Sequence, residues 1–284
     1  MRKFTFRVIT ACVLLSLLST SGCNNKRPET TDSVCADTTI RDSIEQDTLS
    51  TIIAETPLSK AADELFDDFF FNFAANKKLQ LKRIHFPLPV YRNGEKESEI
   101  AKNEWRMENF FMRQGYFTLI FDSRKQMDVV KDTAVKRVVV EKILFKIKTI
   151  KQYVFNRIRG EWIMTSIGYT PLYESVNGSF LKFYERFAGD SAFQVESMND
   201  VVEFTAPDPD DDFGTITGSI VPEQWPGFKP EIIPQGSIYN ILYGQKYTAG
   251  TQKILIVRGI ANDLETEMIF RRRQGHWKLM KFNS

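Results

Sequence analysis

The sequence is poor in the residues that build metal and disulfide sites. Its 284 residues include only 3 Cys and 2 His, too few for a disulfide-rich scaffold and little for a zinc site. The sequence also has no large excess of either charge, because 38 Lys and Arg against 36 Asp and Glu leave a formal net charge of +2. We therefore expect no nucleic-acid partner, since such proteins carry a basic excess.

Motifs of the common catalytic and cofactor sites are also missing. The sequence contains no Gly-x-Gly-x-x-Gly, Gly-x-x-x-x-Gly-Lys, His-Glu-x-x-His, Gly-x-Ser-x-Gly or Cys-x-x-Cys, and those chemistries lose their usual support. The acidic run 208–212 has the alternate carboxylates of a calcium loop, but Phe213 and Ser219 stand where an EF-hand needs Gly and Glu. We interpret the run as a solvated loop and expect no metal and no cofactor.

The sequence has no apolar run long enough to span a bilayer. Residues 8–18 are apolar but number only eleven, whereas a membrane-spanning helix needs about 20. Three basic residues precede this run, and small residues follow it. This pattern is typical of a secretory signal peptide, which we place at residues 1–22.

The end of this segment resembles a bacterial lipobox. Small residues lead into Gly22 and Cys23, although Thr20 stands where Leu is usual. The resemblance implies that Cys23 is the lipid-attachment residue, and Asn24 after it resembles outer-membrane sorting. The expectation is a lipoprotein of the cell envelope, held at the outer membrane of a Gram-negative bacterium by its N-terminal lipid anchor. The alternative is a plain cleavage site followed by a chance cysteine.

Aromatic residues are missing from a long stretch near the N-terminus. None occurs between Phe6 and Phe66, whereas 21 of the 23 Phe follow position 65. A segment without large apolar side chains cannot offset the entropy lost on ordering. We therefore predict that residues 23–58 are a flexible polar linker between the lipidated cysteine and the globular part.

The remaining chain contains one pattern twice. Phe66, Phe69 and Phe73 recur 114 positions later as Phe180, Phe183 and Phe187. Near the other end Phe155, Arg157, Gly160 and Trp162 recur 115 positions later as Phe270, Arg272, Gly275 and Trp277. Between them, Phe86, Trp105 and Gly115 align with Phe204, Trp225 and Gly236. Units of this length suit complete domains, and we predict domains at residues 59–172 and 173–284.

Each unit begins with helical periodicity and ends with strands. Phenylalanines at helical spacing predict a first helix in each unit, with Asn177 or Ser179 as the cap of the second copy and Gly189 as its stop. A short second helix and a Pro-containing segment follow. Strands are predicted at 117–121, 135–145, 151–158, 162–167, 238–243, 254–258, 268–273 and 277–282. Helices before strands favour an α+β fold with helices on one face of a curved antiparallel sheet.

This order of elements resembles the nuclear transport factor 2-like cone fold. A Phe-rich first helix, a second helix, a Pro-containing segment and a closing hairpin with Gly-x-Trp occur twice. The whole arrangement resembles a bacterial family catalogued as domain of unknown function 4348. The resemblance implies two tandem cones, each a bent sheet wrapped on helices and often enclosing a pocket. It also implies that the two copies pair, so that the chain is a monomer with an internal pseudo-dimer.

Candidate ligand-binding residues are aromatic or basic. Trp105 and Trp225 are candidate pocket walls, because indole rings bind apolar and sugar-like faces, although core packing explains them as well. Arg157 and Arg272 occur in both copies and suit either a ligand clamp or a cover over the sheet. The complete candidate set is Tyr91, Trp105, Arg157, Trp225, Tyr239 and Arg272.

Catalysis has weaker support in the sequence. Enzymes of the cone fold usually place an Asp inside the cone, often with Tyr or His, and burial raises the pKa of such a carboxyl. Asp67 and Asp68 are the candidates, but Leu181 and Lys182 replace them in the second copy. We therefore assign no catalytic residue and predict binding of a small ligand or a protein partner. One alternative is a hydrolase, isomerase or dehydratase with its active site inside one cone. Another is a purely structural pair of domains whose cones are filled by their own Phe side chains.

Overall fold

The structure, a computed structural model, describes residues 63–208, 210–245, 247, 250–260 and 264–283. The expected signal peptide, Cys23 and the linker lie outside these residues, as does the start of the first predicted domain. All described residues fall within one compact unit. Among them, no helix is long and apolar enough to cross a membrane.

Each repeat begins with a pair of helices, as the phenylalanine spacing predicts. The pairs are α2 (Phe66–Ala75) with α3 (Lys77–Arg83), and α4 (Gly178–Gly189) with α5 (Ser191–Glu196). The side chains of Asn76 and Asp190, 114 positions apart, each accept a hydrogen bond from the main-chain N–H three residues later, at 3.0 and 2.9 Å. Each therefore caps the second helix of its pair. Short helices follow at η2 (Arg124–Lys131), η3 (Leu172–Glu174), η4 (Pro222–Gln224) and α6 (Trp225–Phe228).

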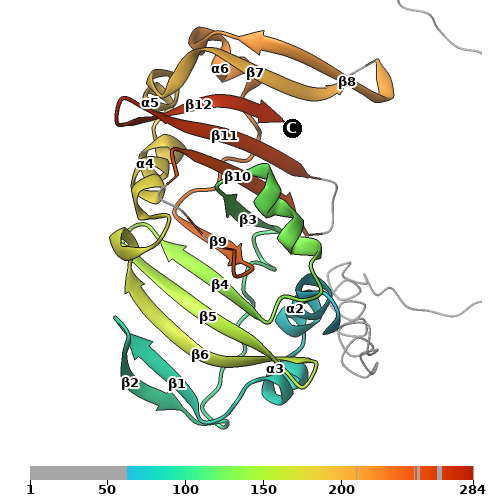
Figure 1. Ribbon diagram of the computed structural model, residues 1–284, viewed down its shortest axis with the longest axis vertical. Coiled ribbons are helices and arrows are strands. Elements are labelled where there is room, and N and C mark those ends of the chain that lie inside the picture. The colour runs from blue at the N-terminus through green and yellow to red at the C-terminus, as the bar shows by residue number, and fades with distance from the viewer. Residues whose placement is uncertain (1–62, 209, 246, 248–249, 261–263, 284) are drawn as a thin grey trace, which may run out of the picture. The chain divides into compact units, whose positions relative to one another are not determined.

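Twelve strands form one continuous mixed sheet (Figure 1). The strands of the first repeat are β1 (Leu88–Arg92), β2 (Glu95–Ile100), β3 (Tyr116–Phe121), β4 (Arg137–Leu144), β5 (Thr149–Ile158) and β6 (Glu161–Pro171). Those of the second repeat are β7 (Met198–Asp208), β8 (Asp211–Ile220), β9 (Ser237–Leu242), β10 (Gln252–Gly259), β11 (Glu265–Arg273) and β12 (His276–Asn283). Their order is β2-β1-β6-β5-β4-β9-β3-β10-β11-β12-β7-β8.

The predicted strands are confirmed, and the Pro-containing segment of each repeat forms a hairpin, β1–β2 in the first and β7–β8 in the second. Prolines and the charged residues of β2 interrupt the alternation of apolar and polar residues from which strands are predicted. The sheet also differs from the antiparallel prediction, because β1 pairs with β6, β12 with β7, and β3 with β9 in parallel. The predicted tight turns are present: Gly160 and Gly275 both have a φ of +85°, a backbone conformation that favours glycine.

The third strand of each repeat lies in the other repeat's half of the sheet. β9 pairs antiparallel with β4, and β3 pairs antiparallel with β10. The two exchanged strands meet in parallel at Thr118 and Asn240, where the Thr118 hydroxyl donates to the main-chain oxygen of Tyr239 at 3.0 Å. Both strands therefore have hydrogen-bonded neighbours on both sides, and the sheet is continuous through its centre.

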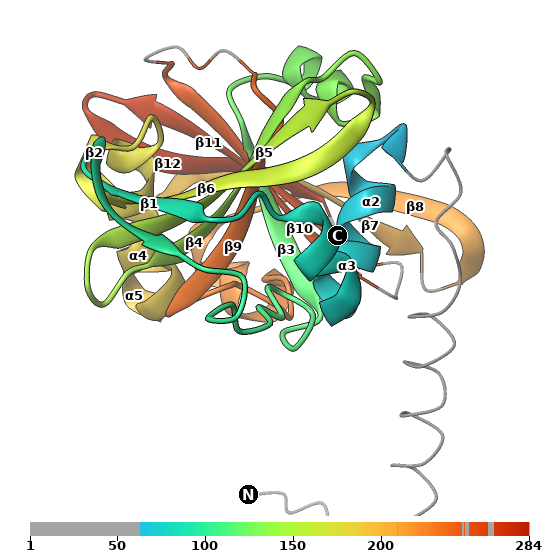
Figure 2. The same cartoon turned by 90° about the horizontal axis from the view of Figure 1, so that it is seen from below.

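The two helix pairs pack on opposite faces of this sheet. Along β10, Ile254 and Ile256 belong to the core beneath α2 and α3, whereas Leu255 and Val257 belong to the core beneath α4 and α5. Successive side chains of a strand point to opposite faces. The prediction of helices on one face therefore holds for each pair separately but not for the whole sheet (Figure 2).

The exchange leaves a buried carboxyl near the centre of the sheet. Glu141 on β4 is 1% exposed and accepts hydrogen bonds from the side chains of Gln152 on β5 and Asn240 on β9, at 3.0 and 3.2 Å. Burial raises the pKa of the Glu141 carboxyl, against the effect of these two hydrogen bonds. Three neighbouring strands from both repeats are thus linked by side chains as well as by main chain.

Residues 59–172 expressed alone should give no folded monomer. This fragment lacks β9, so the main-chain groups of β4 lose their partner strand, and its core loses Tyr239, Ile241 and Tyr243. The full chain should unfold in one cooperative transition. Size-exclusion chromatography and thermal circular dichroism of both proteins test this expectation. A soluble monomeric fragment with a cooperative transition would contradict it.

Candidate functional site

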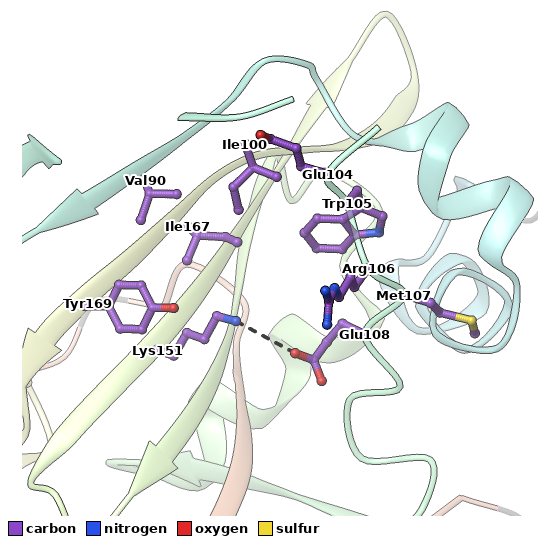
Figure 3. A pocket seen from close by; sticks show the side chains of 10 residues that line it. All are labelled: Val90, Ile100, Glu104, Trp105, Arg106, Met107, Glu108, Lys151, Ile167 and Tyr169. Atoms are coloured by element: carbon purple, nitrogen blue, oxygen red, sulfur yellow. Dashed lines mark ion pairs between the residues drawn. The ribbon is translucent and has the colours of Figure 1, made fainter. Parts of the chain in front are cut away.

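A pocket of about 310 Å³ opens in the first repeat (Figure 3). Its apolar wall is made by Val90, Ile100, Trp105, Met107 and Ile167, and its polar lining by Glu104, Arg106, Glu108, Lys151 and Tyr169. These residues come from β1, the end of β2, the loop after β2, β5 and β6. The pocket thus combines an aliphatic and indole surface with charged groups, the usual composition of a small-molecule site.

Gln80 on α3 fixes the loop that carries Trp105 and Glu108. Its side chain is fully buried, and its oxygen accepts from the Trp105 indole N–H at 3.1 Å and from the Glu108 main-chain N–H at 3.2 Å. Its amide nitrogen donates to the main-chain oxygen of Glu108 at 2.8 Å and to that of Phe73 at 3.0 Å. One side chain therefore ties the pocket wall to the first helix pair.

The Glu108 carboxylate is held by phenols from both repeats. Tyr153 on β5 donates to Oε2 at 2.5 Å, and Tyr239 on the exchanged strand β9 donates to Oε1 at 3.4 Å. Burial and the nearby carboxylate raise the pKa of both phenols above their ordinary value. Both tyrosines therefore remain protonated donors, and a residue of the second repeat bonds to a pocket residue of the first.

Lys151 is the cation at the base of this group. Its Nζ lies 3.8 Å from Glu108 Oε2 and 4.7 Å from the centre of the Tyr153 ring. Partial burial lowers the pKa of the Lys151 ammonium, while Glu108 acts in the opposite direction. Figure 3 shows the Lys151 ammonium and the Tyr169 hydroxyl directed towards the middle of the pocket.

The corresponding place in the second repeat is filled by aromatic rings. Val90 and Ile167 are paired across β1 and β6, and Phe204 and Phe282 are paired across β7 and β12. This register makes Phe204 the equivalent of Val90, so the predicted alignment of Phe204 with Phe86 is wrong. The rings of Phe204 and Phe282 stack with their centroids 5.8 Å apart, and the centroids of the Phe282 and Trp225 rings are 5.3 Å apart. A methyl group on Gly218 would lie 2.7 Å from the Phe204 ring, so this glycine leaves the room that the ring occupies.

The predicted ligand-binding residues fall in four places, of which the hairpins of the two arginines are described below. Trp105 lines the pocket and Tyr239 bonds to its Glu108, as described above. Trp225 is 1% exposed, and its indole N–H donates to Gln194, the equivalent of Gln80, at 2.9 Å. Trp225 is therefore placed in the core, and a buried glutamine binds its indole N–H as Gln80 binds that of Trp105. Tyr91 is half-buried on β1 next to Val90 and so points to the other side of that strand.

The two repeated arginines bond to their own hairpins. Arg157 Nε donates to the main-chain oxygen of Gly160 at 3.4 Å, and Arg272 Nε to that of Gly275 at 3.2 Å. Arg157 also donates to the main-chain oxygen of Thr133 at 2.6 Å. An arginine occurs at this position in both repeats because it bonds to the main chain of the hairpin turn. Both arginines lie outside the pocket.

Sequence reasoning missed Gln80, Glu108, Lys151 and Tyr169. Gln80 carried a usable signal, because Gln194 repeats it at the offset of the helices. The other three have no such signal, since loop conformation and strand register bring them together.

Asp67, a candidate for catalysis, is paired across the repeats. Its carboxylate accepts a hydrogen bond from the hydroxyl of Tyr243, which follows β9. Burial raises the pKa of the Asp67 carboxyl, and the Tyr243 hydrogen bond and Arg258 partly offset this. Asp68 is exposed. Neither residue lines the pocket around Trp105.

The described residues hold no group of three or more His, Cys, Asp or Glu placed to bind a metal ion. His85 and His276 are both exposed. Within the acidic run, β7 ends at Asp208 and β8 begins at Asp211, and Asp208 accepts a hydrogen bond from the Asp210 N–H at 3.0 Å.

Comparisons with known proteins agree with this architecture. Residues 45–284 match the family described as "Domain of unknown function (DUF4348)". A crystal structure of an NTF2-like protein from Bacteroides fragilis NCTC 9343 is similar, with 38% sequence identity and a TM-score of 0.72. The match covers 80% of this chain and 98% of that one. No curated protein matches the sequence.

Asp67→Asn should raise the Tm at neutral pH, and the gain should disappear in acid. A carboxyl whose pKa is raised on folding contributes stability below its unfolded pKa and loses that contribution as the pH rises through the folded pKa. The amide keeps the acceptor for Tyr243 and removes the buried charge. The gain should be on the order of 1 kcal/mol, or about 2–4 °C.

Thermal unfolding between pH 3.5 and 8 measures this difference, and the exposed neighbour variant Asp68→Asn is the matched control. A loss of stability in Asp67→Asn at neutral pH would show that the carboxylate is favoured where it lies.

Proposed function

Because this chain belongs to the DUF4348 family and has an NTF2-like relative, we propose that it binds a small molecule in the pocket of its first repeat, without catalysis. The observation that carries the proposal is the contrast between the repeats. The same fold positions hold Val90 and Ile167 beside a pocket in one and stacked Phe204 and Phe282 in the other. Close packing is the default inside proteins, so a pocket with ordered polar groups beside a filled equivalent points to ligand binding.

The proposal includes two NTF2-like cones, at residues 59–172 and 173–284, that exchange their third strands. Such a chain is its own pseudo-dimer and needs no second copy to pair its sheet, so we propose that it is monomeric. The sharing of Tyr239 with the first repeat's pocket supports this arrangement, because a residue of one repeat contributes to the other's site.

Filling the pocket as the second repeat is filled should abolish binding. We expect Val90→Phe/Ile167→Phe to keep its fold at a cost of about 1–3 kcal/mol from overpacking. A thermal-shift screen of small metabolites should give compounds that raise the Tm of the natural chain but not that of this variant.

Gln194→Ala is the matched control, because it removes the second repeat's indole hydrogen bond far from the pocket. Compounds that stabilise the natural and the filled chains equally would contradict binding at this pocket.

The proposed location is the cell envelope, with the protein held by lipid on Cys23 and separated from the membrane by residues 23–58. The short apolar segment 8–18 before Cys23 and the polar composition after it support this assignment. No partner in the envelope is needed for the pocket to bind a ligand, although a protein partner is compatible with the same anchor.

Cys23→Ser should release the exported protein from the membrane fraction. The natural chain expressed in a Gram-negative host should incorporate labelled fatty acid and sediment with membranes, whereas the variant should do neither. Cys35→Ser is the matched control, since its cysteine lies in the predicted linker. Labelling that persists in Cys23→Ser would contradict the anchor.

An enzyme is the second candidate, and Asp67 is the observation that favours it. Its carboxyl has a raised pKa, as a general acid needs. However, the Tyr243 hydroxyl already donates a hydrogen bond to the Asp67 carboxyl. In the pocket, both oxygens of Glu108 accept hydrogen bonds from phenols. The groups that would have to exchange protons with a substrate are engaged in internal contacts, and binding is therefore preferred.

A further inference from the structure

The two acidic side chains that line the pocket are already engaged. Tyr153 and Tyr239 donate to the two oxygens of Glu108, as described above. Glu104 Oε2 accepts from the main-chain N–H of Ala101 at 2.9 Å and so closes its own turn. Each of these carboxylates thus already has hydrogen-bond donors from the protein itself.

The hydrogen-bond donors of the same pocket have capacity to spare. Lys151 Nζ carries three N–H groups, and its 3.8 Å separation from Glu108 Oε2 is beyond hydrogen-bonding distance. Within the described part of the chain, the Tyr169 hydroxyl and the Arg106 guanidinium have no hydrogen-bond or ion-pair partner. Lys142 lies directly opposite Lys151 on β4 and adds positive charge to this face.

Building on the proposed function, we propose that the ligand is an amphiphilic carboxylic acid. Its carboxylate binds the Lys151 ammonium and the Tyr169 hydroxyl, and its apolar body lies against Val90, Ile100, Ile167 and Trp105. The anion supplies an acceptor for the Tyr169 hydroxyl and a closer partner for Lys151, whose ion pair with Glu108 is 3.8 Å long, and a charge-assisted hydrogen bond is stronger than a neutral one. The apolar body contributes through the area that it removes from water.

Calorimetric titration of the full chain with three eight-carbon probes tests the head group. Octanoate, octanol and octylammonium have eight carbons each and differ in charge. We expect octanoate to bind at least tenfold tighter than either of the others. Glucose serves as a probe for a sugar ligand, which the indole wall would also accept.

Variants at one position test the proposed contact. Lys151→Met should lower the affinity for octanoate at least tenfold and leave the affinity for octanol within twofold. The substituted side chain is of similar length but has no charge. Lys151→Arg, which keeps the charge, should stay within threefold of the natural chain for octanoate. Lys281→Met, a half-buried strand lysine of the second repeat, is the matched control and should change neither affinity.

Three outcomes would overturn the carboxylate assignment. They are equal affinities for octanol and octanoate, tighter binding of octylammonium or glucose, and failure of octanoate to bind. In each case the proposed function survives if other compounds still bind the natural chain and are lost in Val90→Phe/Ile167→Phe. It fails separately if no compound distinguishes those two proteins.

Discussion

Main-chain pairing of the exchanged strands is the constraint on which the rest of this structure depends. β9 completes the ladder of β4, and β3 completes that of β10. Buried main-chain groups must find partners, so neither half of the sheet is complete without the other repeat. The same exchange brings Tyr239 to Glu108 and Tyr243 to Asp67. The first repeat's core and its pocket are therefore products of both halves of the chain.

Two repeats with one plan have diverged in what fills them. Both use a buried glutamine to hold an indole N–H, Gln80 with Trp105 and Gln194 with Trp225. Around this shared contact, one pair of strands carries Val90 and Ile167, and the other carries Phe204 and Phe282. The difference in side-chain volume is enough to replace a pocket by a stack of rings.

The polar groups of the pocket are positioned by contacts that reach well beyond it. Gln80 links the Trp105–Glu108 loop to α2, and Tyr239 links Glu108 to the second repeat. Such second contacts fix the orientation of side chains that face a ligand. The acidic groups are satisfied by this network, whereas the donors of Lys151 and Tyr169 face the pocket.

The sequence by itself determined the repeat, the helix stripes, most of the strands and the hairpin glycines, because these depend on spacing along the chain. It also singled out Trp105. It did not show Glu108, Lys151 and Tyr169 as a group, nor that Arg157 and Arg272 would bond to their own turns. Only the tertiary structure decided these points, together with the strand exchange and the two-sided packing of the helices. The physical reason is that strand pairing, side-chain hydrogen bonds and cavity volume depend on residues far apart in the sequence. Periodicity within a short segment does not identify those residues.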